Sequence, residues 1–102
     1  MQDIFSKITG FEWDKNNIGK NQQKHDVYYT ECEEMFFSQP FLLYPDPKHS
    51  KQEKRYYVLG KTNLNRKLFA VFAIRNNKIR IISARDMSRK ERKIYEEAKK
   101  DS

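Results

Sequence analysis

The residues best suited to chemistry lie in the segment 79–85, where two arginines and a serine interrupt an otherwise apolar strand. A charge near the core of a sheet costs free energy unless it has a partner. Strict alternation predicts Ser83 and Arg85 on one face of this strand, about 7 Å apart, and Arg80 on the other. Because arginine pairs two phosphate oxygens at once, the segment favours phosphate binding over a simple ion pair of Arg85 at a strand end.

A second polar group, in one short stretch, consists of His49, Ser50, Glu53 and Arg55. Histidine changes its protonation state near neutral pH, and a glutamate orients it or acts as a base itself. Loops supported by a sheet commonly carry such groups. The alternative interpretation, which the spacing by itself favours, is an ordinary polar surface loop.

Several other residues have side chains that are able to take part in catalysis or binding, but a structural role is enough to account for them. Lys24 and His25 end a predicted helix, where cations interact favourably with the helix dipole. The basic run 89–93 on the last predicted helix either contacts phosphates or forms a solvated face. Cys32 lies on the apolar side of a predicted helix, so inert packing is expected. Four aromatic residues at strand positions are predicted to be core: Tyr56, Tyr57, Phe69 and Phe72.

The composition excludes several classes of protein. The chain has 102 residues, 37% of them hydrophobic and 34% charged, which predicts one domain over residues 1–102 with one modest core. A single cysteine excludes an internal disulfide and a cysteine-built zinc site, and the three glycines do not form a phosphate-binding loop. We therefore expect no metal and no cofactor. No apolar run is long enough to span a bilayer, and the N-terminus lacks a signal peptide, so a cytoplasmic location is expected.

Charge is divided unevenly along the chain. Residues 1–50 contain 5 Lys, no Arg and 8 acidic residues, which gives −3, whereas residues 51–102 contain 9 Lys, 7 Arg and 6 acidic residues, which gives +10. The sum is the net charge of +7. All arginines lie in the second half, which favours a polyanionic partner such as nucleic acid. A solvated basic surface is the alternative.

The hydrophobic pattern predicts an α+β fold in the order β-α-α-β-β-β-β-α. Capping boxes are predicted at Thr30-x-x-Glu33 and Ser88-x-x-Glu91, and Asn76-Asn77 matches a two-residue hairpin turn. The hairpins make the sheet mostly antiparallel, with the helices packed on it. The predicted strands are 10–14, 41–44, 55–61, 67–75 and 78–85, the predicted helices are 14–24, 29–37 and 88–99, and a solvated loop is predicted over 45–54.

Several segments, in order and with compatible spacing over residues 11–96, resemble the BrnT toxins, the toxin half of a bacterial type II toxin–antitoxin pair. The segments that carry the resemblance are Phe11-Glu12-Trp13-Asp14, Asn21-x-x-Lys24-His25-x-Val27, Asp46-x-x-His49-Ser50-x-x-Glu53-x-Arg55, Gly60, Arg80-Ile81-Ile82-Ser83-Ala84-Arg85 and Arg89-x-x-Arg92-x-x-Tyr95-Glu96. Two positions depart from the pattern, because Asp26 replaces a usual glycine and Asn17 replaces a common basic residue.

The resemblance implies a RelE-like fold, a small antiparallel sheet flanked by helices. It also implies an endoribonuclease that arrests translation and is neutralised by a ribbon-helix-helix antitoxin, BrnA. Because that antitoxin dimerises, the expected complex has two of each chain and binds operator DNA through the antitoxin. RNA is the expected substrate and no membrane is involved.

Metal-free cleavage of RNA needs a base for the 2′-OH, cations for the phosphoryl oxygens and an acid for the departing 5′-oxygen. On this hypothesis Arg80 and Arg85 stabilise the phosphorane-like state and Ser83 donates a hydrogen bond to a phosphate oxygen. His49 or His25 is the acid or base, with Glu53 the other candidate. The residues expected to bind the RNA backbone are Lys24, His25, Arg55 and Arg89. The rival hypotheses are a basic nucleic-acid-binding module without chemistry and a module whose charge serves an acidic antitoxin segment.

Overall fold

The computed structural model describes residues 4–15, 18–19, 25–49 and 53–100. The α+β fold class predicted from the pattern is confirmed. The elements, in chain order, are β1 (Gly10–Phe11), α2 (Tyr29–Met35), β2 (Leu42–Pro45), the short 3₁₀ helix η1 (Pro47–His49), β3 (Arg55–Lys61), β4 (Lys67–Arg75), β5 (Lys78–Asp86) and α3 (Arg89–Lys100).

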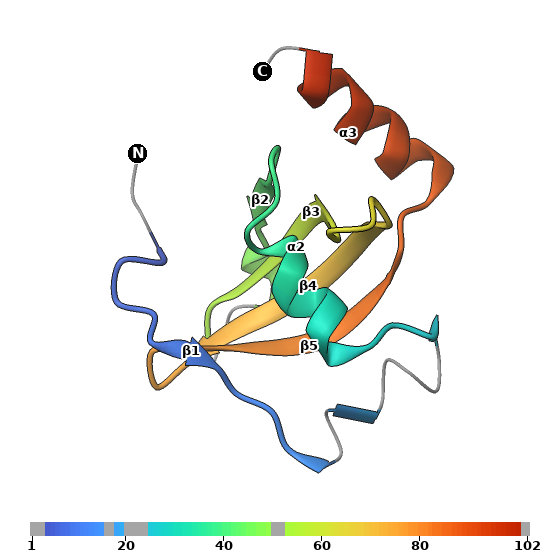
Figure 1. Ribbon diagram of the computed structural model, residues 1–102. Helices are drawn as coiled ribbons and strands as arrows, with labels where there is room; N and C mark the ends of the chain where they lie inside the picture. The colour runs from blue at the N-terminus through green and yellow to red at the C-terminus, as the bar shows by residue number, and fades with distance from the viewer. Residues whose placement is uncertain (1–3, 16–17, 20–24, 50–52, 101–102) are drawn as a thin grey trace.

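The strands form one sheet in the order β1-β5-β4-β3-β2 (Figure 1). The pairs among β2, β3, β4 and β5 are antiparallel, and the short β1 is parallel to β5. The predicted hairpin between β4 and β5 is confirmed, because Asn76 and Asn77 have φ of 53° and 61°. Asparagine tolerates this left-handed region better than most residues.

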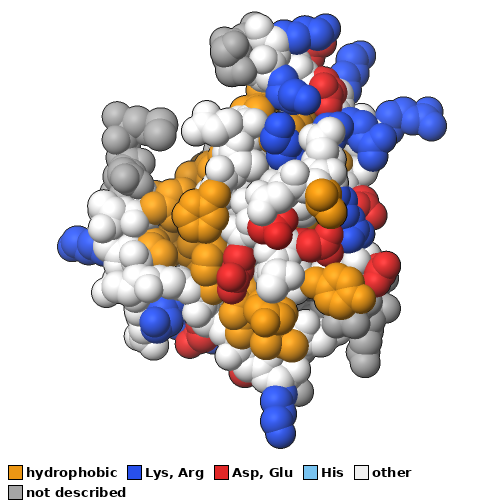
Figure 2. Space-filling model, viewed as in Figure 1, with side chains coloured by type: hydrophobic (Ala, Val, Ile, Leu, Met, Phe, Trp, Pro, Cys, Tyr) orange, Lys and Arg blue, Asp and Glu red, His pale blue; other side chains and the backbone are white. Residues whose placement is uncertain are grey.

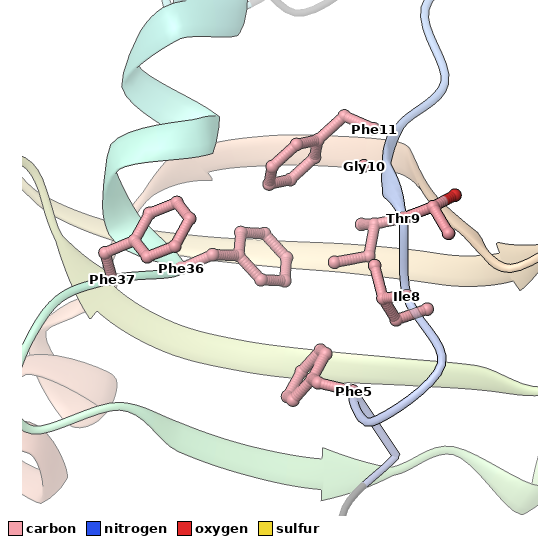
Figure 3. A pocket seen from close by; sticks show the side chains of 8 residues that line it. Phe5, Ile8, Thr9, Gly10, Phe11, Phe36 and Phe37 are labelled. Carbon is pink, nitrogen blue, oxygen red and sulfur yellow. The ribbon is translucent and has the colours of Figure 1, made fainter.

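One face of the sheet carries the main core, which lies beneath α2 (Figure 1). Cys32 and Met35 from the helix and Phe72 from β4 are fully buried there. The N-terminal segment packs on the same core, where the rings of Phe5, Phe11 and Phe36 converge (Figure 3). The burial of Cys32 raises the pKa of its thiol to about 12, so this cysteine is an inert packing residue, as expected.

The opposite face carries a smaller cluster at the end of the sheet where α3 packs. Leu59, Met87 and Tyr95 form this cluster, and the Tyr95 hydroxyl donates a hydrogen bond of 2.6 Å to the carbonyl of Pro40. The amphipathic α3 therefore covers only one end of this face. The rest of the face is occupied by the polar side chains described below.

Several predicted boundaries were wrong. The box at Thr30-x-x-Glu33 does not form: α2 begins at Tyr29, and the Tyr28 N–H donates to Glu31 Oε1 at 3.0 Å. Glu33 instead accepts a 2.7 Å hydrogen bond from Trp13 Nε1, a tertiary contact that removes it from capping. The predicted loop 45–54 begins with the last residue of β2 and contains η1. Of the predicted helix 14–24, the structure describes residues 14, 15, 18 and 19.

Candidate functional site

An irregularity in β5 determines which side chains share a face. Val71 of β4 pairs with Ser83, but the next residue, Phe72, pairs with Ile81, so Ile82 is an extra residue in β5. Such a bulge reverses the alternation of side chains beyond it. Consistent with this, Ile79, Ile81 and Ala84 all belong to the main core.

The bulge corrects the predicted arrangement of the arginine strand. Arg80 precedes the core residue Ile81, while Ser83 and Arg85 flank the core residue Ala84. All three polar residues therefore lie on the face opposite α2. Strict alternation, which separated Arg80 from Arg85, was wrong because it ignored the extra residue.

Cross-strand pairing brings residues from β3 and β4 next to this group. Arg55, Ala73 and Arg80 form one row across β3, β4 and β5. The next row consists of Tyr57, Val71 and Ser83, and the third of Leu59, Phe69 and Arg85. In the first row the small side chain of Ala73 separates the two arginines. In the second row Val71 lies between Tyr57 and Ser83. We call the three rows together the arginine face.

Arg85 is the most constrained member of the arginine face. Its Nη1 and Nη2 donate to the two carboxylate oxygens of Glu91 at 2.8 and 2.9 Å. Its guanidinium lies 4.1 Å from the centroid of the Phe69 ring. The hydrogen bonds from Arg85 lower the pKa of Glu91 below its ordinary value of 4.5, so this pair is ionised at neutral pH.

Arg80 and Arg75 also contact carboxylates. Arg80 donates to Glu12 at 3.3 Å and to Asp14 at 3.0 Å, while Arg75 donates from Nε and Nη2 to both oxygens of Glu53, at 3.1 Å each. The hydrogen bonds from Arg75 lower the pKa of Glu53. At neutral pH Glu53 is therefore a carboxylate with both oxygens occupied.

The remaining predicted site residues are distributed more widely. Arg89 is exposed at the start of α3. The His25 carbonyl accepts a 3.3 Å hydrogen bond from Arg66, and Arg66 also binds Asp86 at the end of β5. Because side chains alternate along a strand, Asp86 points to the face opposite that of Arg85. The structure thus does not bring His25 onto the arginine face. Lys24, Ser50 and the side chain of His49 lie outside the described residues.

Glu91 and Tyr57 contribute to this part of the molecule, and neither was predicted to do so from the sequence. Glu91 was recognised only as part of a capping box, because its contact with Arg85 depends on how α3 folds back on the sheet. Tyr57 was predicted to be core, but alternation places it beside Arg55 on the arginine face, where its ring stacks on Tyr44 at 5.1 Å. Tyr56 does pack on the main core, as predicted.

The α2 side of the molecule offers a different surface (Figure 2). Apolar and acidic side chains share its centre, and Lys and Arg gather mainly over α3. An apolar pocket of about 360 Å³ lies between the N-terminal segment and α2 (Figure 3). Its lining contains no ionisable side chain, so it provides no acid, base or cation for catalysis.

The described residues contain neither a metal-binding cluster nor a membrane-spanning helix. No three His, Cys, Asp or Glu side chains within these ranges are grouped as metal ligands would be. No helix in the described part of the chain is long and apolar enough to cross a membrane.

Comparison with known proteins assigns the chain to a family. The family model for BrnT, the ribonuclease toxin of a type II toxin–antitoxin system, matches residues 13–91, and no curated protein matches the chain. The matched region includes β2 to β5, the arginine face and Glu91. Family membership implies RNA as the substrate class and an antitoxin as the partner class. The chain belongs to the BrnT family of ribonuclease toxins of type II toxin–antitoxin systems.

Proposed function

We propose that this protein is a metal-independent endoribonuclease that inhibits translation by cleaving RNA at its arginine face. The observation that carries the proposal is the bulge at Ile82, which gives Arg80, Ser83 and Arg85 a common face. Clustered arginines stabilise the negative charge that develops on a phosphoryl group in the transition state. A hydroxyl donor between them adds a hydrogen bond to the same group.

In the proposed reaction the 2′-OH of the RNA is the nucleophile. A base removes its proton, and the 2′-oxygen bonds to the adjacent phosphorus. The bond from phosphorus to the 5′-oxygen breaks, and an acid protonates that oxygen. The products are a 2′,3′-cyclic phosphate and a free 5′-hydroxyl. Arg80 and Arg85 stabilise the phosphorane-like state, Ser83 donates to a phosphoryl oxygen, and Arg55, Arg89 and Lys24 hold the RNA backbone.

The candidates for the acid and the base are His49, His25 and Glu53. The lowered pKa of Glu53 leaves it without a proton to donate at neutral pH, so its remaining role is that of a base. Its hydrogen bonds with Arg75 also make it a weaker proton acceptor. His49 is the better candidate for the acid, because histidine is the side chain most often used for proton transfer in enzymes and the structure does not bring His25 onto the arginine face.

We also propose the finer properties that the family resemblance implies. The fold is RelE-like, which is supported by the antiparallel order of β2 to β5 with helices on both faces. The partner is a BrnA-like ribbon-helix-helix antitoxin in a complex of two toxin and two antitoxin chains, which binds operator DNA through the antitoxin. The toxin acts in the cytoplasm, where its RNA substrate lies.

The test compares the wild-type protein with Arg85→Ala on a 5′-labelled RNA in EDTA. We expect wild-type protein to produce fragments that end in cyclic phosphate. Arg85→Ala should cleave on the order of 100- to 1,000-fold more slowly, because it lacks a donor to the developing charge. Lys7→Ala, which removes an exposed charge from the N-terminal segment that packs on the α2 side, is the matched control and should retain activity. Circular dichroism checks that each variant is folded.

Two results would overturn this proposal. A folded Arg85→Ala protein that cleaves at the wild-type rate removes Arg85 from the mechanism. RNA that stays intact with wild-type protein, both alone and with added ribosomes, excludes the nuclease. Salt-dependent binding without cleavage would then support the rival hypothesis of a basic nucleic-acid-binding module.

A further inference from the structure

We infer that Glu91 is a positioning residue, which holds Arg85 so that one particular edge of the guanidinium faces a phosphoryl group. The inference rests on the proposed function and adds a residue to it.

A guanidinium offers two edges that bind a pair of oxygens, an end edge (Nη1 with Nη2) and a side edge (Nε with Nη2). In Arg85 the end edge is occupied by Glu91, and Nη1 also donates to the carbonyl of Asp86 at 3.0 Å. The Nε–H and the second Nη2–H make no hydrogen bond to any residue that the structure describes. Arg66 and Arg75 differ, because each places its side edge on a carboxylate.

Glu91 is itself held in place at the first turn of α3. Its Oε1, which accepts from Arg85, also accepts the backbone N–H of Ser88 at 2.9 Å. The backbone N–H of Glu91 donates to Ser88 Oγ at 3.2 Å, which completes the predicted capping box. The carboxylate therefore cannot swing away without disturbing the start of the helix.

Phe69 fixes the plane of the same guanidinium. Its ring centroid lies 4.1 Å from Arg85 Cζ, and Phe69 is the cross-strand partner of Arg85. Three elements thus hold one side chain: β5 carries it, β4 supports its plane and α3 holds its end edge. The Arg85 side chain is still 37% exposed, so solvent and substrate have access to it. The side edge is presented in a preorganised orientation that matches two phosphoryl oxygens.

A competing role for Glu91 predicts the opposite effect of mutation. If Glu91 only occupied Arg85 in place of a phosphate, its removal would free the arginine and speed cleavage. If Glu91 positions Arg85, its removal lets the guanidinium move and slows cleavage. RNA binding would not weaken in either case, because removing the Glu91 carboxylate takes away one negative charge that repels the RNA.

The test is Glu91→Gln, assayed as kcat and KM on the RNA that the wild-type protein cleaves. Glutamine preserves the capping box but not the ion pair. We expect kcat to fall on the order of 10- to 100-fold, with KM unchanged or lower. Glu91→Asp keeps the charge but shortens the side chain, and it should also lose kcat. An unchanged or raised kcat in the folded variants would overturn the inference.

Ser88→Ala is the matched control for a purely structural role. It weakens the same helix start but leaves the contact between Glu91 and Arg85 in place, so kcat should stay within twofold of wild type. If Ser88→Ala and Glu91→Gln lower kcat equally, Glu91 is structural. In an Arg85→Lys background Glu91→Gln should have no further effect on kcat, since lysine has no end edge to hold.

A binding experiment separates this inference from the proposed function. The Arg85 Nε–H resonance is identified as the one missing from Arg85→Lys, and it is followed by NMR as non-cleavable 2′-O-methyl RNA is added. We expect a shift in wild-type protein and a much smaller shift in Glu91→Gln. Equal shifts would overturn the inference even if the protein cleaves RNA. The expected shifts without any cleavage would overturn the nuclease while Glu91 retains its positioning role in binding.

Discussion

The Arg66 side chain forms hydrogen bonds to three separate segments of the chain. Its Nε and Nη2 donate to Asp86 at 2.7 and 3.1 Å, and its Nη1 donates to Glu31 at 3.1 Å and to the carbonyl of Asp26 at 2.9 Å. Asp26, where the family resemblance leads us to expect glycine, has a φ of 55°. The arginine thus joins this left-handed turn to the start of α2 and the end of β5.

At the scale of this residue we predict an acid-sensitive contribution to stability. The hydrogen bonds from Arg66 lower the pKa of Asp86 below its ordinary value of 3.8. A lowered folded-state pKa stabilises the protein above the unfolded-state value, and this contribution is lost as the pH falls through the folded-state pKa. Arg66→Met should therefore lower the free energy of unfolding at pH 7. Between pH 5 and about 2, the free energy of unfolding of this variant should decrease less than that of the wild-type protein.

The measurement is urea unfolding of both proteins across that pH range. Arg89→Met is the matched control, because Arg89 is exposed at the start of α3 and no salt bridge among the described residues includes it. The free energy of unfolding of Arg89→Met, plotted against pH, should run parallel to that of the wild-type protein. If the plot for Arg66→Met were also parallel to the wild-type plot, the lowered pKa of Asp86 would have another cause.

At the scale of elements, the close approach of α2 to β3 depends on a single glycine. A Cβ at Gly60 would lie 2.9 Å from both the carbonyl oxygen of Met35 and Ser38 Oγ. The Ser38 hydroxyl donates to that carbonyl at 2.7 Å and accepts the Lys61 N–H at 3.2 Å. The end of α2 is thus bonded directly to the strand, with no space for a methyl group.

We predict that Gly60→Ala destabilises the fold by about 1–3 kcal/mol, the usual cost of overpacking. Because one obstructing atom is a backbone oxygen, the strain cannot be relieved by a rotamer change. Gly19→Ala is the control: nothing lies within 4 Å of a Cβ there, and alanine favours a helix. Chemical denaturation measures both. Equal stability of Gly60→Ala and wild type would mean that α2 can move away from β3 at little cost.

At the scale of the whole molecule, folding brings the two unequal halves of the charge pattern together. Glu12, Asp14 and Glu31 from the acidic half bind arginines of the basic half. Part of the positive charge is therefore balanced internally. The basic residues at the surface of α3 remain to attract a polyanion.

We therefore predict that RNA binding falls steeply between about 50 and 200 mM salt. Arg89→Ala should weaken binding to non-cleavable RNA of any sequence and reduce the slope of log affinity against log salt by about 1. Lys7→Ala removes one charge from the segment that packs on the α2 side, and its slope should be unchanged. Fluorescence anisotropy at several salt concentrations gives the slopes. Equal slopes for Arg89→Ala and wild type would remove Arg89 from the RNA interface.

The local pattern of the chain was sufficient for much of the fold. The hydrophobic pattern of β3 and β4, the Asn76-Asn77 turn and the capping box at Ser88 are short-range signals, and each was predicted correctly. Thr30-x-x-Glu33 has the same local form as the box at Ser88, but its glutamate binds Trp13 instead. A local signal fails when a distant residue offers a better partner, and nothing in the local pattern reveals that partner.

The sequence by itself determined the fold class, the uneven charge and the arginine strand that carries the family resemblance. Only the tertiary structure decided that Arg80, Ser83 and Arg85 share a face, because the bulge at Ile82 exists only in register with β4. It also decided the partners of the arginines, since Glu12 and Arg80 are 68 residues apart in the chain. Contacts of this kind depend on the packing of whole elements, which the spacing of residues along the chain does not encode.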